Sequence, residues 1–214
     1  KFLFVKRGTS VRHDHVLYPD SVFYGNNTAT ANLLPLALGI VPDSCKEDVV
    51  RNVVANIMTA NKGHVPCGVI GISWLMRGLS ENGFADVAYM LATNDTYPSW
   101  GNWVANGATT LLENWDLNAT RDISDNHMMF GEIGGWLYKG LGGIYPDVKF
   151  PGFKHIILKP YVPRDLKQFE ATYHSSYGKI YSGWEQVNGK ITYKVIVPPN
   201  STATLYLPDN LSGD

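Results

Sequence analysis

The sequence predicts a mixed fold, in which a helical part is followed by an antiparallel β-sandwich. Up to Tyr145, apolar residues recur at helical spacing, and glycines fall between the periodic segments. After Asp147, short segments alternate between apolar and polar residues and are separated by turn residues. We therefore expect one domain over residues 1–147 and a second over residues 148–214. Residues 1–25 show no clean period, so we expect them to be irregular.

The helical part is expected to contain several helices joined by short turns. The clearest lies near residues 46–62, with an apolar stripe, Ser44 as the expected N-cap, Glu47 at the third helical position and Gly63 at its end. Pro35 should kink or shorten the first helix, because it lacks an amide hydrogen. Helices of this length favour antiparallel neighbours, as in a helical toroid. The expected helices lie near residues 28–39, 46–62, 69–82, 84–94, 98–106 and 127–142.

The β-rich part is expected to contain short strands joined by tight turns. Asn188-Gly189 suits a type I′ hairpin turn, and Ser176-Tyr177-Gly178 is expected to form another turn. Several short strands at this spacing predict an antiparallel sandwich. The expected strands lie near residues 154–160, 167–176, 178–187, 190–197 and 201–208.

Composition excludes several classes of protein. The formal net charge is −1, from 18 basic and 19 acidic residues, and no basic stripe is present, so we expect no nucleic-acid partner. No apolar run reaches the length of a membrane span, and Lys1–Val5 is too short for a signal peptide core. Because Lys1 is not an initiator, we expect a chain that was cut from a longer protein or processed. Cys45 and Cys67 are not in a CxxC motif, so we expect free thiols.

The most informative segment surrounds a single carboxylate. Glu113 lies between Trp103 and Trp115 in a mostly apolar context, and Asn126-His127 follow after a polar loop. Aromatic rings can cover the C–H faces of a sugar, amide and imidazole groups can fix its hydroxyls, and the carboxylate can act as a general base. Structural roles are more common for such a carboxylate and for a histidine at a helix start. Large aromatics usually fill cores. We expect one or two of four tryptophans to line a pocket: Trp100, Trp103, Trp115 and Trp136.

Other polar residues have simpler explanations. Asp116 is the nearest alternative to Glu113 as a general base, but it is expected to cap the following turn. Glu132 is expected to be structural. His13-Asp14-His15 has the spacing of a metal pair without further ligands, so we expect no metal and no cofactor. His64 is expected to order a loop. No nucleophile elbow, P-loop, dinucleotide fingerprint or zinc-protease motif is present.

Three blocks of the sequence, taken in order, resemble the bacterial α-L-rhamnosidases of glycoside hydrolase family 78. The blocks are YPSWGNWVANGATTLLENWD, DNHMMFGEIGGWLYKGLGGI and PGFKHIILKP. Residues 63–101 are similar to the later helices of that family's catalytic barrel, and residues 175–208 to its C-terminal β-domain. The resemblance covers nearly all residues from about position 25 onward.

The resemblance implies half of an (α/α)6 barrel followed by a jelly-roll-like sandwich. It implies inverting hydrolysis of terminal α-L-rhamnosyl residues, and therefore a rhamnose-containing carbohydrate as the substrate. By the same resemblance Glu113 is the base that activates water, and His127 contacts the sugar with Asn126 beside it. The sequence does not reveal the compartment; a periplasmic or secreted bacterial protein is favoured over a cytoplasmic one, and any export signal would lie outside this chain.

The sequence also departs from the family pattern. The family's general acid lies in an Asp- and Arg-rich motif on an earlier helix, and nothing in residues 1–112 is similar to it. We therefore expect the chain to begin midway through the barrel and to be inactive alone. The loop over residues 118–125 is shorter than the family leads us to expect. Another helical-toroid glycosidase and a non-catalytic carbohydrate-binding or structural module remain as alternatives.

Overall fold

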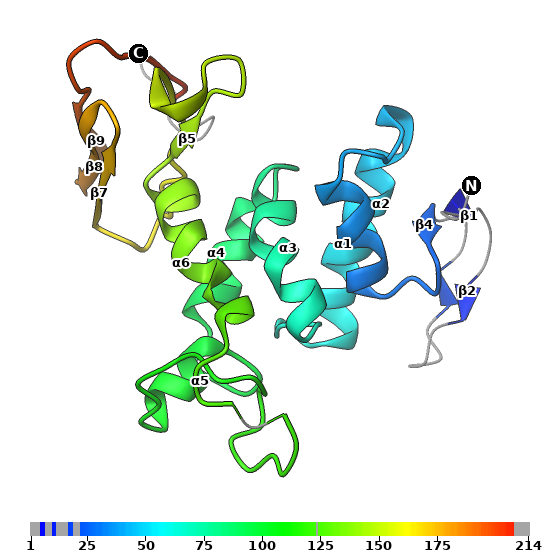
Figure 1. Cartoon of the computed structure of the whole chain (residues 1–214). Helices are drawn as coiled ribbons and strands as arrows, with labels where there is room; N and C mark the ends of the chain where they lie inside the picture. Colours follow the sequence, from blue (N-terminus) through cyan, green and yellow to red (C-terminus); the bar gives the residue numbers. More distant parts are fainter. Residues whose placement is uncertain (1–4, 7–9, 12–16, 19–21, 123, 208–214) are drawn as a thin grey trace. The chain divides into compact units, whose positions relative to one another are not determined.

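The computed structural model describes residues 5–6, 10–11, 17–18, 22–122 and 124–207. The chain divides into two compact units, Lys1–Ile133 and Gly134–Asp214 (Figure 1). The first unit is mainly helical and the second is mainly β-structure. Among the described residues, none of the helices combines the length and the apolar character that a membrane span needs.

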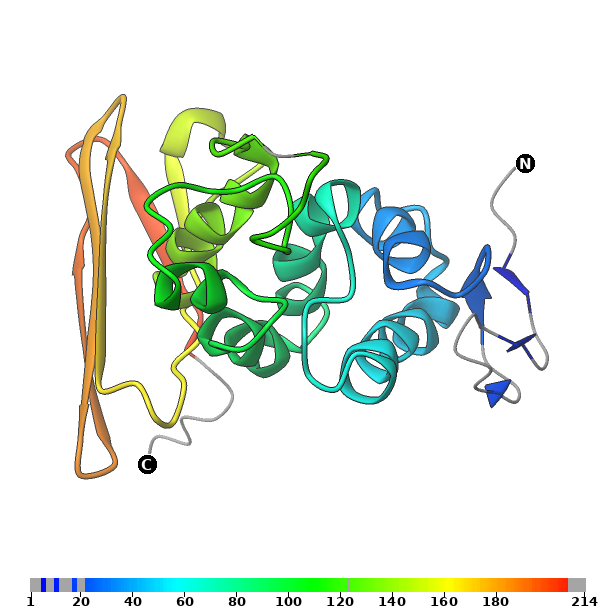
Figure 2. The same ribbon diagram turned by 90° about the horizontal axis from the view of Figure 1, so that it is seen from below.

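The helices of the first unit pack on one another in succession. Helix α1 packs on α2 and α3, and α3 packs on α4 and on the short helix η2. Figure 2 shows α1, α2 and α3 nearly end-on. All six expected helices are confirmed, although the last is divided into three short segments. Their bounds are α1 Ala29–Ala37, α2 Asp43–Ala55 with the π-helix η1 Asn56–Ala60, α3 Val69–Ser80, α4 Ala85–Thr93, α5 Trp100–Ala105, and then η2 Met128–Gly131, α6 Glu132–Trp136 and η3 Leu137–Leu141.

The start of α2 differs from the prediction. The helix begins at Asp43, and Pro42 occupies the N-cap position without a side-chain hydrogen bond. The prediction of Ser44 as N-cap and Glu47 as third residue is therefore wrong. The physical reason is that Pro42 has an extended backbone that ends the preceding coil, while the Asp43 carboxylate favours the positive end of the helix dipole. Gly63 does follow the helical segment, and its N–H donates to the Ile57 carbonyl at 2.8 Å.

Buried asparagines connect the beginning of the chain to the helices. The Asn32 amide donates to Asn27 Oδ1 at 2.8 Å, and Asn27 donates to Asn52 Oδ1 at 3.2 Å. Asn52 in turn donates to the Val22 carbonyl at 2.9 Å, and Asn32 Oδ1 accepts the Tyr24 N–H at 2.8 Å. Because each of these amides has a partner, the network carries little of the cost of burying polar groups.

Short strands precede α1, so the expectation of an irregular start is wrong at these positions. Strand β1 (Val5–Lys6) pairs with β4 (Phe23–Tyr24), and β2 (Ser10–Val11) pairs with β3 (Leu17–Tyr18), both antiparallel. Helix α1 contains Pro35 and ends at Ala37, before the expected residue 39.

In the second unit, the residues that the structure describes form two three-stranded sheets. One has the order β10-β6-β5 and the other β7-β8-β9. All five expected strands are confirmed, β5 was not predicted, and β10 runs parallel to β6. The two hairpins form where expected: Asn188 and Gly189 both have positive φ, and Ser175 pairs with Gly178. The strands are β5 Ile144–Pro146, β6 His155–Leu158, β7 Gln168–Ser175, β8 Gly178–Val187, β9 Lys190–Ile196 and β10 Thr202–Leu205, with a 3-10 turn η4 at Pro151–Phe153.

The end of η3 and the glycine that follows it hold strand β8 through their backbone carbonyls. The Trp184 indole N–H donates to the Leu141 carbonyl at 2.9 Å, and the Ser182 hydroxyl donates to the Gly142 carbonyl. Gly143 has φ +66°, and a Cβ atom there would lie 2.2 Å from the Pro160 nitrogen. Only glycine fits this position without moving backbone atoms. The core of this unit consists of Ile144, Ile156, Leu158, Ala171 and Ile180.

Candidate functional site

Helix α5 places two tryptophans in the core of the first unit. Ser99 caps the helix, because its hydroxyl accepts the Asn102 N–H at 2.9 Å. Trp100 and Trp103 follow at a spacing of three residues, which puts both rings on one side of the helix. Trp115 stacks on Trp103 with ring centroids 4.5 Å apart.

Each indole of this cluster also fixes a backbone carbonyl. Trp103 Nε1 donates to the Trp115 carbonyl at 3.1 Å, and Trp115 Nε1 donates to the Cys67 carbonyl at 2.9 Å. Trp100 Nε1 donates to the Phe130 carbonyl at 3.0 Å, and the Phe130 ring packs edge-on against Trp115 at 4.7 Å. The aromatic cluster, defined as Trp100, Trp103, Trp115 and Phe130, therefore holds both ends of the segment that carries Glu113.

The four tryptophans have no role as open stacking surfaces. Their exposed fractions are 5% for Trp100, 2% for Trp103, 9% for Trp115 and 2% for Trp136. The expectation that one or two would line a pocket is wrong. Burial of the rings, together with indole N–H groups that donate to main-chain carbonyls in the aromatic cluster, accounts for the difference.

Glu113 closes the loop that follows it. Its N–H donates to the Ser124 carbonyl at 2.9 Å, and its Oε2 accepts the Ser124 N–H at 3.2 Å. Two residues earlier, the Leu111 carbonyl accepts the His127 N–H at 2.7 Å. The two chain segments therefore run back along each other, and this brings the glutamate and the histidine to the same place.

The structure brings the Glu113 and His127 side chains together. Glu113 Oε1 lies 3.8 Å from His127 Nδ1, and both side chains are 27% exposed. This separation is longer than a hydrogen bond but within reach of electrostatic attraction when the imidazole is protonated. One carboxylate oxygen is thus held by an amide, while the other faces an imidazole at the surface. Such a carboxylate can accept a proton from water.

Asn126 lies beside His127 in the chain and is exposed. It lines an open hollow of about 700 Å³, together with residues 106–110 and 124–125. Glu113 and His127 do not line this hollow. The Asn126 N–H donates to the Ser124 hydroxyl at 3.4 Å, which fixes its backbone within the returning segment.

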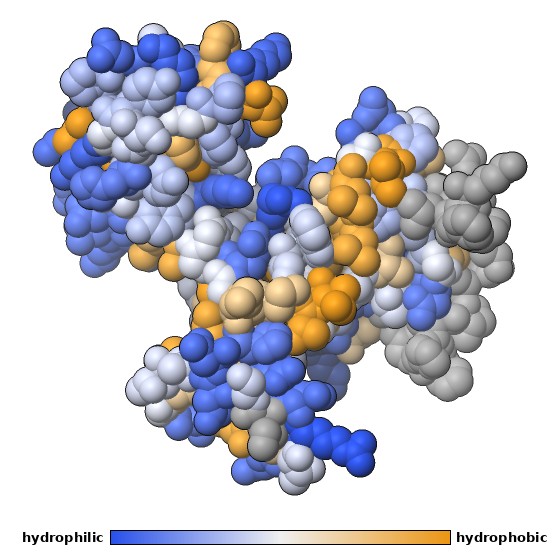
Figure 3. Space-filling model, viewed as in Figure 1, coloured by the Kyte–Doolittle hydropathy of each residue, from blue (hydrophilic) through white to orange (hydrophobic). Residues whose placement is uncertain are grey.

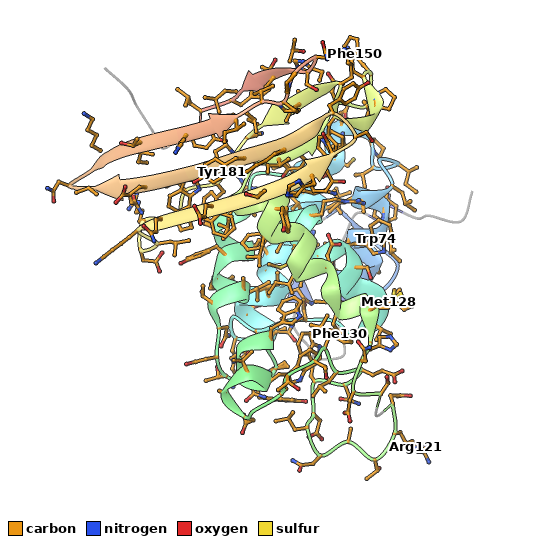
Figure 4. All side chains as sticks on the ribbon, turned by 60° about the vertical axis from the view of Figure 1, so that its left-hand side comes forward. Trp74, Arg121, Met128, Phe130, Phe150 and Tyr181 are labelled. Atoms are coloured by element: carbon orange, nitrogen blue, oxygen red, sulfur yellow. The ribbon has the colours of Figure 1, made fainter. Side chains whose placement is uncertain are left out.

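No sequence pattern singled out Met128. Its side chain is 84% exposed directly after His127, whereas Phe130 is 1% exposed. In Figure 4, Met128 lies at the outer side of the short helix η2, and Phe130 is turned toward the helices. Helix α3 supports η2, since the Ser73 hydroxyl lies 4.0 Å from Met129 Sδ. This neighbourhood depends on contacts between distant segments, which no local pattern reveals.

Several expected structural roles are confirmed. Asp116 caps its turn by accepting the Asn118 N–H at 2.9 Å. His64 orders its loop, with Nε2 2.9 Å from the Thr96 hydroxyl. Cys45 and Cys67 are free thiols, and burial raises the pKa of Cys67 to about 12.

His13-Asp14-His15 lies outside the described residues. Within the part of the chain that the structure describes, no three His, Cys, Asp or Glu side chains gather into a group that could hold a metal ion.

Comparison with known proteins identifies the chain's family. Residues 6–141 match the bacterial α-L-rhamnosidase 6 hairpin glycosidase domain. The chain belongs to the bacterial α-L-rhamnosidase family. Residues 143–213 match the C-terminal domain of the same rhamnosidases. Both matches confirm the resemblance and the expected order of a helical glycosidase part and a β-sheet domain.

Curated α-L-rhamnosidases are similar over most of this chain. One from Streptomyces avermitilis is 31% identical over 189 residues, which are 85% of this chain and 18% of that protein. One from Formosa agariphila is 34% identical over 192 residues, 86% of this chain and 20% of that protein. The chain therefore spans about a fifth of the length of the curated relatives that it matches.

Solved rhamnosidase structures share the fold. The α-L-rhamnosidase from Dictyoglumus thermophilum has a TM-score of 0.82 and 30% identity, covering 89% of this chain and 22% of that one. The Streptomyces avermitilis α-L-rhamnosidase complexed with L-rhamnose has a TM-score of 0.80 and 30% identity, covering 86% of this chain and 18% of that one. Members of this family are glycoside hydrolases.

Proposed function

We propose that this chain is the base-carrying part of an inverting α-L-rhamnosidase, with residues 1–147 forming the later half of an (α/α)6 catalytic barrel and residues 148–214 the β-sandwich. The observation that carries the proposal is the Glu113 carboxylate, held by the Ser124 N–H through Oε2 and facing His127 through Oε1. Its partial exposure lets water reach the carboxylate while the fixed oxygen restricts its rotation.

In this mechanism Glu113 activates the attacking water. Its Oε1 takes a proton from the water, whose oxygen attacks the anomeric carbon while the bond to the leaving oxygen breaks. An inverting enzyme places its acid and base about 6.5–9.5 Å apart to leave room for this water. The acid protonates the leaving oxygen, and we propose that it lies outside this chain.

The histidine and asparagine are proposed to hold the sugar. His127 Nδ1 faces the carboxylate, which leaves Nε2 to contact a sugar hydroxyl. Asn126 is exposed beside the hollow and offers an amide donor and acceptor. The substrate is a glycan or glycoside with a terminal α-L-rhamnosyl residue.

Exposed apolar side chains on the helical unit support the proposal that this unit is part of a larger barrel. Figure 3 shows apolar areas among polar ones on this unit. Leu38 is 61% exposed, Ile40 49% and Ile70 58%. In the proposed whole enzyme, further helices of the barrel would cover side chains of this kind.

The test compares Glu113→Gln with the wild type in a protein that carries this chain and the rest of the barrel. Release of p-nitrophenol from p-nitrophenyl α-L-rhamnoside should fall about a thousandfold or more, equivalent to about 4 kcal/mol of barrier. Asp116→Asn is the matched control and should keep full activity, because Asp116 only caps a turn. Equal rates for Glu113→Gln and wild type would leave Glu113 as a loop-closing residue and contradict its role as base.

The stereochemistry tests the inverting course separately. NMR spectra of the first-formed rhamnose should contain the β-anomer. Retention of the α-configuration would require a glycosyl-enzyme intermediate and would rule out the proposed mechanism. The isolated chain should release no rhamnose.

A further inference from the structure

The outer face of the β7-β8-β9 sheet, which is the face turned away from the core of the second unit, has a glycine at its centre. Strand pairing aligns Glu170, Gly183 and Lys194 side by side across the three strands. Because side chains alternate between faces, these residues share one face, while Ala171 and Ile180 point into the core on the other. Glycine at the middle position leaves the centre of this outer face without a side chain.

The Tyr181 ring fills part of that space. A Cβ atom at Gly183 would lie 2.5 Å from Tyr181 Oη and 2.9 Å from Cζ, so the ring lies along the strand over the glycine. The Tyr181 hydroxyl donates to Glu170 Oε2 at 2.9 Å. Figure 4 shows Tyr181 on this sheet. The hydrogen bond and the glycine together hold the ring before any ligand arrives, which lowers the entropic cost of binding.

A hollow of about 530 Å³ adjoins the ring. This volume lies within the roughly 300–1,000 Å³ typical of small-molecule sites. Two carboxylates, Glu170 and Glu185, and one ammonium group, Lys194, line it together with the Thr192 hydroxyl. The mixture of charges favours neither an anion nor a cation, but it offers many hydrogen-bond donors and acceptors.

We propose that this hollow is a second saccharide-binding site, which holds a neutral sugar by stacking on Tyr181 and by hydrogen bonds to Glu170, Thr192 and Lys194. An aromatic ring fixed beside groups that both donate and accept hydrogen bonds suits the apolar face and the hydroxyls of a sugar. The proposed role of this site is binding, not cleavage. The proposal does not depend on the role of Glu113.

The first experiment follows the backbone amides of the whole chain by ¹⁵N NMR during titration with methyl α-L-rhamnopyranoside and, separately, methyl β-D-glucopyranoside. Sugar binding should shift the amides of β7, β8 and β9 around Tyr181. Tyr181→Ala should weaken the apparent affinity at least about tenfold. Absence of shifts on these strands with both sugars would overturn the proposal and leave Tyr181 as a ring that only covers a glycine.

Tyr177→Ala is the matched control. Tyr177 is an exposed tyrosine with Lys154 Nζ 5.3 Å from its ring centroid, but it belongs to the β7–β8 turn. This variant should bind sugar like the wild type. Equal weakening by both variants would overturn the site, because it would show a general effect of removing tyrosine.

Two further measurements separate this site from the proposed catalytic one and from misfolding. Glu113→Gln should leave the sugar-dependent shifts around Tyr181 unchanged, whatever it does to hydrolysis. Tyr181→Phe keeps the ring and removes its bond to Glu170, so it should retain part of the affinity. Full wild-type affinity in a folded Tyr181→Ala variant would overturn the proposal.

Discussion

The chain uses aromatic rings in two opposite ways. In the aromatic cluster of the first unit, Trp103 is 2% exposed and donates to a main-chain carbonyl. On the outer face of the second unit, Tyr181 is partly exposed and donates to the Glu170 carboxylate. The hydrogen-bond partner of the polar group on each ring separates the two roles. An indole that donates to a buried carbonyl fixes the backbone, whereas a phenol tied to a surface carboxylate keeps its ring at the surface.

The largest expected effect is on stability, where a buried ring should matter more than a partly exposed one. Trp103→Ala should lower the free energy of unfolding by about 3–5 kcal/mol, because it removes a buried ring and leaves a cavity. Urea unfolding of the chain, followed by near-ultraviolet circular dichroism, measures this. Trp74→Ala, at a partly exposed ring that packs with Arg77, should cost about 1 kcal/mol or less. Similar losses for the two variants would contradict the distinction.

A second prediction tests whether the region around the aromatic cluster excludes water. Burial raises the pKa of the Cys67 thiol to about 12, so the reactive thiolate is scarce at pH 8. In a Cys45→Ala variant, Cys67 should react with Ellman's reagent at least about tenfold more slowly in the native state than after denaturation. The neutral thiol favours the folded state, so this contribution to stability is complete below pH 9 and is lost as the pH rises toward 12. Fast labelling of the native protein would refute the prediction.

The smallest expected effect concerns the phenol on the outer face. The pKa of Tyr181 is raised, first by its hydrogen bond to Glu170 and only then by burial. Glu170→Gln should therefore return this pKa toward its ordinary value in an NMR titration. The protonated phenol makes the bond, so any stabilisation is present below pH 10 and lost as the pH rises through the raised pKa. Tyr181→Phe should change stability by about 0.5 kcal/mol or less. An unchanged Tyr181 pKa in Glu170→Gln would assign the shift to burial instead.

Local patterns predicted most of the elements, and distant contacts account for the failures. The hairpin at Asn188-Gly189 was predictable because the turn's backbone depends on those two residues alone. Strand β5 was missed because three residues ending in Pro146 show no period. Burial of the tryptophans was misjudged because residues far apart in sequence meet around them, as where the Trp115 indole donates to the Cys67 carbonyl.

At the candidate site too, some features could be predicted from the sequence and others depend on distant contacts. Residue types and the family resemblance singled out Glu113 and His127, and the structure brings their side chains to 3.8 Å. Their role in catalysis stays a prediction. The outer face escaped sequence analysis, because Glu170, Tyr181 and Gly183 meet only through strand register.

Gly143 limits how freely this sequence can vary. Its missing side chain lets the backbone of residues 159–160 approach, and the Lys159 N–H donates to its carbonyl at 2.8 Å. A library that substitutes every position should find this glycine among the least replaceable residues, while exposed positions such as Asn118 accept many side chains. For anyone recombining rhamnosidase segments, a crossover point should therefore keep Gly143 and the 159–160 backbone from the same parent.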